Sequence, residues 1–456
     1  MVQDVPISDV SSGGVPNLSN FDFGSVLQNI LFQMGQDPLH AMIWLFLHGG
    51  WVIFLFLGWF AFRALWLDSV QLKAQKKKRF IVLAIDVPRE SLQTVKAVDN
   101  LFAHLAGAHS PIGLKEKWID GKTQDPMSVE IISIEGHVQY LMHCNAGLRD
   151  LIEASVYAQY PDAEITEVED YATKVPQHYP DDTYDCFGTE LIPVKSDVYP
   201  IKNYEHFEDK MTGEFKDPLA ALLEAFSRLG PGEQAWYQII ITPIDQKEFG
   251  KKSATEMVAL KGERRPPKPT FADHVANAPM AVLGAAGNVI FGTGVSADTK
   301  KREENQMKML MLTPGERGKM EAVEKKAAKI QYKCKIRFMY IGRKEVFQKG
   351  KILQSFIGAI KQFNTNDLQA LKPEGNKVGV NGALLFMRDR RNNHRKNKLI
   401  RGYRSRSDWV GVALFHMGTD ELAGLWHLPV VKDVKAPQLK KTEAKKIEPP
   451  INLPFG

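Results

Sequence analysis

The sequence predicts an α+β protein in which one N-terminal transmembrane helix precedes two consecutive β-α-β-β-α-β units, the second interrupted by a long helical insertion. Three observations support this fold class. They are an uncharged apolar run near the N-terminus, alternating strand-like and helix-like segments after it, and the recurrence of that alternation further along the chain. The chain has 456 residues, 44% hydrophobic and 25% charged, which predicts a packed core and excludes a polytopic membrane protein.

The apolar run covers residues 41–62 and contains no formal charge. At about 1.5 Å per residue it forms a helix of ~33 Å, which matches a hydrocarbon core of about 30 Å. We place the transmembrane helix at residues 41–66, with Ala41, Trp44, Trp59 and Phe62 in the membrane span. A buried core helix is the alternative. A cleaved secretory signal is disfavoured because no Lys or Arg precedes Arg63.

Charge on the two sides of the run predicts its orientation. Aspartates precede it, and six Lys and Arg residues follow it between Arg63 and Arg79. By the positive-inside rule, residues 1–40 are expected outside the cytoplasm and the bulk of the chain inside it. The three cysteines are an odd number and cannot form an even disulfide framework, which agrees with a reducing compartment.

Residues 79–175 form the first predicted unit. Its segments follow the order strand, helix, strand, strand, helix, strand, at 79–87, 90–105, 127–134, 138–144, 145–160 and 163–168. Between the two middle strands, Glu135-Gly136-His137 is typical of a β-hairpin turn. This element order is that of a ferredoxin-like unit, an antiparallel sheet with two helices on one face.

The second predicted unit covers residues 183–430 and repeats this order. Strands are expected at 186–194, 198–201, 234–243 and 332–341, and helices at 218–229 and 349–363. An insertion at about 245–330 carries a proline cluster, a Gly/Ala-rich apolar stretch and a charged helix that begins at Thr313 and Pro314. The Lys- and Pro-rich tail, residues 431–456, is expected to be disordered.

Motifs that indicate catalysis are absent from the sequence. It contains no phosphate-binding loop of the form G-x-x-x-x-G-K-[ST], no H-E-x-x-H, no C-x-x-C and no G-x-S-x-G. We therefore expect no enzyme activity, no catalytic residues, no cofactor, no metal and no small-molecule substrate. The alternative is an enzyme whose pocket has no sequence signature.

A basic cluster between residues 388 and 406 is the candidate binding site. Its members are Arg388, Arg390, Arg391, Arg395, Lys396, Lys398, Arg401, Arg404 and Arg406, with Tyr403 and Trp409 close in sequence. Such a density of cations favours contact with the phosphate backbone of DNA, with Tyr403 or Trp409 stacking on an unpaired base. Anionic lipid, an acidic protein partner and a solvated loop stay open as alternatives.

Six segments, in this order, resemble those of a known family. They are IDVPRESLQTVKAVDNLFAHLAG, SVEIISIEGHVQYLMHC, LIEASVYAQYPDAEITEVEDY, ELIPVKSDVYPIKNYEHF, LEAFSRLGPGEQAWYQIIITP and DELAGLWHLP. Over residues 80–430 the chain resembles the N-terminal non-ATPase region of conjugative DNA-transfer (type IV secretion-like) ATPases of candidate-phyla (Patescibacteria-type) bacteria, a domain family of unknown function. The pump-type ATPase domain that usually comes next in that family does not follow here.

The resemblance implies a membrane-anchored, non-enzymatic accessory or adaptor module of a conjugative DNA-transfer apparatus that lacks its own ATPase motor. The expected location is the bacterial inner membrane, and the expected partner is a separate pump-type ATPase or further copies of the chain, with DNA as a further candidate. The basic cluster supports a second interpretation, a membrane-tethered nucleic-acid-binding protein that uses Arg388–Arg406 directly.

Overall fold

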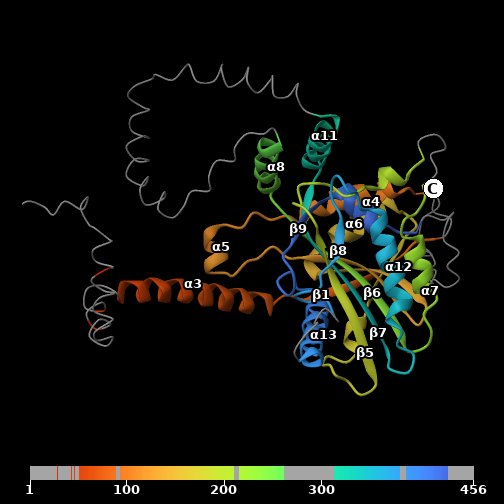
Figure 1. Cartoon of the computed structure of the whole chain (residues 1–456), viewed down its shortest axis with the longest axis horizontal. Coiled ribbons are helices and arrows are strands. Elements are labelled where there is room, and N and C mark those ends of the chain that lie inside the picture. Colours follow the sequence, from red (N-terminus) through yellow and green to blue (C-terminus); the bar gives the residue numbers. More distant parts are fainter. Residues whose placement is uncertain are drawn as a thin grey trace, which may run out of the picture. The chain divides into compact units, whose positions relative to one another are not determined.

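The computed structural model describes residues 51–88, 93–209, 215–260, 313–380 and 387–429, together with Gln28, Ile43 and Phe46 (Figure 1). The chain forms two compact units, one made of residues up to Lys76 with Leu114–Lys122, and one made of the remainder. The predictions for residues 1–40, for most of 41–50, for most of the insertion and for the tail 431–456 lie outside the described residues.

The first unit contains helix α3 (Trp51–Gln75) and the short helix α5 (Leu114–Trp118). Of the residues predicted in the membrane span, Trp59 and Phe62 lie on α3 with exposed side chains, whereas Ala41 and Trp44 lie outside the described residues. Among the helices that the structure describes, none is long and apolar enough to cross a membrane, and the predicted transmembrane helix is not found among them.

The second unit is built on one antiparallel sheet of nine strands. Its first half consists of β1 (Phe80–Asp86), α4 (Val95–Leu105), β2 (Met127–Ile134), β3 (His137–Asn145), α6 (Arg149–Gln159) and β4 (Glu164–Val168). Its second half consists of β5 (Tyr184–Pro193), α7 (Ala220–Ser227), β6 (Glu233–Pro243), β7 (Gln331–Arg343), α12 (Lys349–Gln362) and β8 (Leu371–Pro373).

The strand order is β4-β1-β3-β2-β6-β7-β5-β8, and β9 (Phe415–Gly418) pairs with β7. Strands β2 and β6 pair antiparallel, so the two halves share one continuous sheet. Each half has the same internal order, since β4-β1-β3-β2 is mirrored by β8-β5-β7-β6. The α+β class and the antiparallel strand pairing agree with the sequence prediction, whereas the single sheet shared by the two halves was not predicted.

Both faces of the sheet are covered. On one face, residues of α4, α6, α7, α12 and α14 (Thr419–Leu425) complete the larger apolar core, and Figure 1 shows α4, α6, α7 and α12 grouped together. On the other face, α13 (Arg388–Arg404) and the short 3-10 helix η5 (Tyr171–Lys174) pack over the sheet. The strand residues alternate between the faces, as shown by Leu83 in the first core and Ala84 in the second. This second face carries the candidate site.

Local sequence signals account for several elements. Glu135 and Gly136 have φ values of 53° and 89°, which is the two-residue turn that matches the twist of the β2–β3 hairpin. Helix α11 (Pro314–Ala328) begins as predicted, with Thr313 as its N-cap and Glu316 completing a capping box.

Two expectations about elements differ from the structure. The strand predicted at 198–201 is replaced by a turn and a bend, where Asp197 pairs with Lys252 and with His416 of β9, and Val198 packs with Phe249 and Val323. Within the insertion, predicted to be helical, residues 246–260 form helix α8 (Gln246–Leu260), which contacts α11. The basic cluster, for which a solvated loop was one alternative, is the helix α13.

Candidate functional site

Helix α13 carries most of the basic cluster, and its buried stripe explains why it is a helix. Asn392, Arg395, Leu399 and Tyr403 are buried and recur at intervals of three or four residues. Two of these four residues are polar, so the stripe is weak as a hydrophobic pattern. The helix is therefore defined by tertiary contacts more than by its own apolar residues.

Two glycines let α13 approach the sheet closely. A Cβ on Gly188 of β5 would lie 2.4 Å from a methyl carbon of Leu399 on α13, and a Cβ on Gly402 of α13 would lie 3.2 Å from the Arg337 guanidinium of β7. The first distance is too short for a real Cβ contact and the second is unusually tight, so larger residues at either position would push the helix away from the sheet. The cations on the outer face of α13 are thereby held at a fixed height above the strands.

The C-terminal end of α13 is closed by an unusual residue. The Ser407 amide donates to the Gly402 carbonyl at 3.1 Å and the Arg406 amide to the Tyr403 carbonyl at 3.1 Å, which is the Schellman pattern. Its left-handed position is normally glycine, yet here it is Arg406 with φ 45°. The ion pairs of the Arg406 side chain, with Glu130 and Asp170, offset the backbone strain of this left-handed conformation.

The Arg406 guanidinium lies in a buried ionic network. It pairs with Glu130 of β2 at 3.2 Å and with Asp170, and Glu130 also accepts from the Tyr171 hydroxyl at 2.7 Å. Burial raises the pKa of Glu130, but the charge and hydrogen bonds of Arg406 outweigh it and lower the pKa to about 2. Glu130 is therefore a carboxylate in the folded protein, and the network ties α13 to η5 and to the sheet centre.

A polar row crosses the sheet beneath the end of α13. Glu130, Gln238, Arg337 and Glu190 face one another on the neighbouring strands β2, β6, β7 and β5. The Arg337 guanidinium donates to Glu190 at 2.7 Å and to the carbonyls of Gly402 and Val410 at 2.8 and 2.6 Å. A cation at the carbonyl end of a helix is favourable, and here it also fixes the position of α13.

Three of the nine predicted site cations have internal partners. Arg395 is buried and donates to the carbonyls of Gly375, Asn376 and Gly379, so it clamps the loop after β8. Lys396 pairs with Asp185, and Arg406 lies in the network above. These three side chains are removed from the predicted binding surface because their hydrogen-bonding groups are already used.

The remaining six predicted cations lie at the surface of α13. Arg388, Arg390, Arg391 and Arg401 are exposed, and Lys398 and Arg404 are half-buried. The structure gives none of these six an ion pair with any residue that it describes. Of the two aromatic residues proposed for base stacking, Trp409 is 83% exposed, whereas Tyr403 is fully buried and cannot stack on a base.

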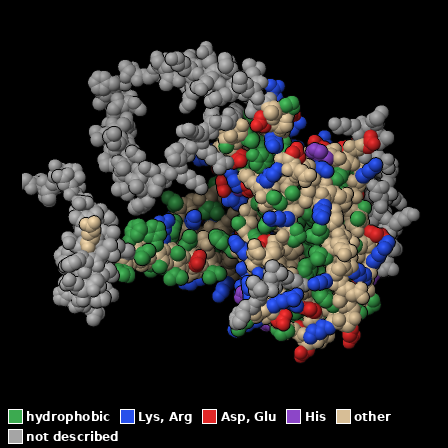
Figure 2. All heavy atoms as spheres, in the orientation of Figure 1, with side chains coloured by type: hydrophobic (Ala, Val, Ile, Leu, Met, Phe, Trp, Pro, Cys, Tyr) green, Lys and Arg blue, Asp and Glu red, His purple; other side chains and the backbone are tan. Residues whose placement is uncertain are grey.

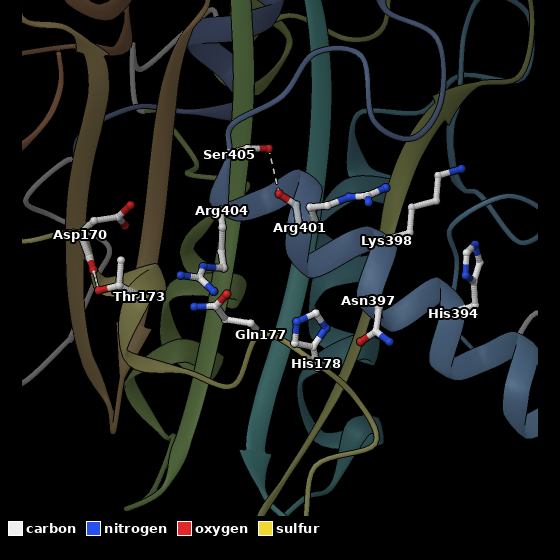
Figure 3. A pocket seen from close by; sticks show the side chains of 10 residues that line it. All are labelled: Asp170, Thr173, Gln177, His178, His394, Asn397, Lys398, Arg401, Arg404 and Ser405. Carbon is white, nitrogen blue, oxygen red and sulfur yellow. Dashed lines mark hydrogen bonds between the residues drawn. The ribbon is translucent and has the colours of Figure 1, made fainter. Parts of the chain in front are cut away.

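A groove of about 480 Å³ lies beside three of these cations. It is lined by Asp170, Thr173, Gln177, His178, His394, Asn397, Lys398, Arg401, Arg404 and Ser405. Figure 3 shows the α13 side chains on one wall and the residues of η5 and the following loop on the other, with Arg404 and Gln177 pointing toward one another. Its only carboxylate, Asp170, is already paired with Arg406.

The groove is suited to an anion with several oxygens. It offers two guanidinium groups, one ammonium group, amides, hydroxyls and two imidazoles, and its lining contains no free carboxylate to repel a phosphate. His178, Gln177 and Thr173 could not be identified from the sequence, because they lie more than 200 residues before α13 and form no recognisable motif with it. Only the fold links the two segments, through Arg406 with Asp170 and through two hydrogen bonds between Asn397 and the Tyr179 backbone.

Groups suited to other chemistry are not assembled in the described parts of the chain. No group of three or more His, Cys, Asp or Glu side chains there could hold a metal ion. Burial raises the pKa of both the Cys144 and the Cys186 thiols to about 12, which keeps them protonated and weak as nucleophiles.

Because some cations of the cluster are buried and others are exposed, replacing one of each is expected to change the free energy of unfolding by different amounts. Replacing Arg395 with Ala is expected to lower the free energy of unfolding by about 2–3 kcal/mol, because the buried guanidinium is lost and three loop carbonyls lose their charged donor. Arg391→Ala, an exposed change on the same helix, is expected to stay within ~0.5 kcal/mol. Urea denaturation of the two variants measures both values, and equal losses would contradict this expectation.

Comparison with known proteins identifies a family without an assigned activity. No curated protein matches the chain. A family model described as a domain of unknown function, DUF8128, matches residues 69–441, a range that includes the whole sheet and α13. The chain therefore belongs to the DUF8128 family of domains of unknown function.

Proposed function

We propose that this protein is a non-enzymatic accessory module of a conjugative DNA-transfer apparatus, held at the bacterial inner membrane by its N-terminal segment, and that α13 is its contact with nucleic acid. One observation carries the nucleic-acid part of the proposal. Six cations on the outer side of α13 have no carboxylate partner among the described residues, and three of them line a groove without a free acid. Unpaired cations on a rigid helix are available for phosphate groups.

The transfer-apparatus part rests on the segments that resemble the non-ATPase region of DNA-transfer ATPases. The membrane part rests on the apolar run 41–62 and on the cations that follow it. We also infer that the two halves of the sheet are ferredoxin-like units. The β-α-β-β-α-β order of each half and its strand order support this inference. A motor ATPase or a second copy of the chain is the protein partner that the proposal expects.

The nucleic-acid contact is tested by measuring DNA affinity as a function of salt. For a contact made by six cations, the logarithm of the binding constant is expected to fall with the logarithm of salt with a slope of about −5. The triple variant Lys398→Gln/Arg401→Gln/Arg404→Gln is expected to reduce the slope by about 3 and weaken binding about 100-fold at 0.1 M salt. Fluorescence anisotropy with a labelled duplex and a labelled single strand gives both quantities.

A matched control distinguishes α13 from basic residues elsewhere. The triple variant Lys344→Gln/Lys349→Gln/Lys361→Gln removes the same charge from positions around α12. If this control changes the slope as much as the α13 variant, binding depends on net charge and the assignment to α13 is wrong. If neither variant changes binding, but the α13 variant loses an acidic protein partner recovered from cells, the adaptor role stands without the nucleic-acid contact.

A further inference from the structure

The first unit has a surface that the proposed nucleic-acid contact does not use. Along α3 the large apolar side chains from Trp51 to Trp66 are exposed, among them Phe54 at 70% and Leu65 at 69%. Figure 2 shows this helix covered by hydrophobic side chains. Soluble surfaces seldom carry a continuous apolar stretch of this size, so the helix requires an apolar environment.

Helix α5 packs against the end of this stretch. The indole N–H of Trp66 donates to the Trp118 carbonyl at 3.2 Å, and the Arg63 guanidinium carbon lies 4.7 Å from the centre of the Trp118 ring. The turn after α5 approaches α3 so closely that a Cβ on Gly121 would lie 2.5 Å from the Val70 carbonyl oxygen. These contacts fix α5 beside the point where the apolar part of α3 gives way to polar residues.

A cavity of about 590 Å³, open to the outside, lies between α3 and α5. Its lining consists of Trp59, Phe62, Arg63, Trp66 and Trp118. Four of these side chains are aromatic and only one is charged, so the cavity combines a hydrophobic wall with a single cation at its rim. The Arg63 guanidinium stacks on the Trp118 ring, and it has no carboxylate partner within the described residues.

Helix α5 itself carries exposed cations and exposed apolar residues. Lys115 and Lys117 are exposed, and neither has an ion pair with a described residue, whereas Lys122 pairs with Glu116 at 3.0 Å. Leu114, the first residue of the helix, is 80% exposed, and Ile119, directly after it, is 65% exposed. Tryptophan, a basic rim and protruding aliphatic side chains in one place are typical of the boundary between lipid headgroups and hydrocarbon.

We propose that this cavity is a binding site for an anionic phospholipid of the membrane. The acyl chain lies against Trp59, Phe62 and Trp66, and the phosphate contacts Arg63 at the rim. The combination of aromatic wall and single cation favours this occupant, because a neutral apolar ligand would leave the Arg63 charge without a partner, and a free anion would leave the aromatic wall exposed. The site rests on the membrane association in the proposed function, but it doesn't depend on the nucleic-acid contact.

The test uses the full chain, purified in a mild detergent and titrated with dioleoyl phosphatidylglycerol or dioleoyl phosphatidylcholine, with native mass spectrometry to count bound lipids. We expect one phosphatidylglycerol per chain and at least about fivefold weaker retention of phosphatidylcholine, which is the effect of one charge near a lipid surface. Arg63→Gln and Trp118→Ala are each expected to lower phosphatidylglycerol occupancy by about fivefold. Trp409→Ala, an exposed Trp of the second unit, serves as the matched control and is expected to leave it unchanged.

A flotation assay with vesicles of the same two lipids distinguishes lipid binding in the cavity from binding of the whole chain to a membrane. A chain that floats with vesicles while both variants retain as much lipid as the wild type overturns the lipid site and leaves the membrane proposal standing. A chain that retains phosphatidylglycerol without floating supports the site and contradicts the anchor. Retention of neither lipid, or equal retention of both, overturns the site. Arg63→Gln keeps the test valid if Trp118→Ala fails to fold, and thermal melting of each variant identifies that failure.

Discussion

The Arg337→Met variant is expected to lose about 3–5 kcal/mol of unfolding free energy, because it leaves a buried charge without its partner. Neither Arg337 nor Glu190 has any exposed side-chain surface, and Arg337 Nε lies 2.7 Å from Glu190 Oε1. Without the guanidinium, the Glu190 carboxylate keeps the neutral amide of Val412, at 2.6 Å, as its hydrogen-bond donor. The Ser407 carbonyl loses its charged donor, and the Val410 carbonyl keeps Lys335 Nζ at 2.9 Å.

A double-mutant cycle tests the cause of that loss. The variant Arg337→Met/Glu190→Gln removes both charges and retains an oxygen to accept from Val412, so it is expected to recover much of the stability lost in the single variant. Chemical denaturation of the two single variants and the double variant gives the coupling energy. Arg401→Met, an exposed change on α13, is the control and is expected to stay within ~0.5 kcal/mol. If the double variant is as unstable as the sum of the singles, the pair isn't coupled and the loss comes from packing alone.

Much of the strand and helix content could be predicted because the sheet is covered on both faces. Strands such as Met127–Ile134 and Glu233–Pro243 are buried almost throughout, so they stand out in the sequence as apolar runs of strand length. Their pairing could not be predicted, because β2 meets β6 across about a hundred residues of intervening chain. The pattern of each strand specifies its faces but not its neighbour.

The site could be predicted only in part, because sequence cannot distinguish a cation that holds the fold from one that faces solvent. Arg391 and Arg395 lie one helical turn apart and look alike, yet the first is exposed and the second is buried. The difference comes from three loop carbonyls that surround Arg395. Similarly, Glu130 resembles the polar position of an alternating strand, and its partner Arg406 is 276 residues away.

Glu130 and His143, which lie close to Arg406, are expected to contribute to acid unfolding, together with other carboxylates whose pKa the fold lowers, such as Asp197. The fold lowers the pKa of Glu130 from 4.5 to about 2, so its contribution of about 3 kcal/mol is complete above pH 4.5 and is lost as pH falls toward 2. Burial and Arg406 lower the pKa of His143 from 6.5 to about 4, which favours the neutral ring in the folded state. The unfolded chain therefore takes up a proton first, and a loss of stability of similar size, about 3 kcal/mol, begins as pH falls below 6.5.

Two variants test whether Glu130 and His143 cause the loss of stability in these two pH ranges. Glu130→Gln starts less stable at neutral pH, because Arg406 keeps only Asp170, but its loss of stability between pH 4.5 and 2 is expected to be about 3 kcal/mol smaller than that of the wild type. His143→Gln is expected to remove the decline between pH 6.5 and 4. Glu169→Gln, whose side chain is 86% exposed, is the control and should follow the wild-type curve. Urea denaturation at a series of pH values measures all four curves. A Glu130→Gln variant that still declines as steeply as the wild type below pH 4.5 would show that the acid sensitivity arises outside this network.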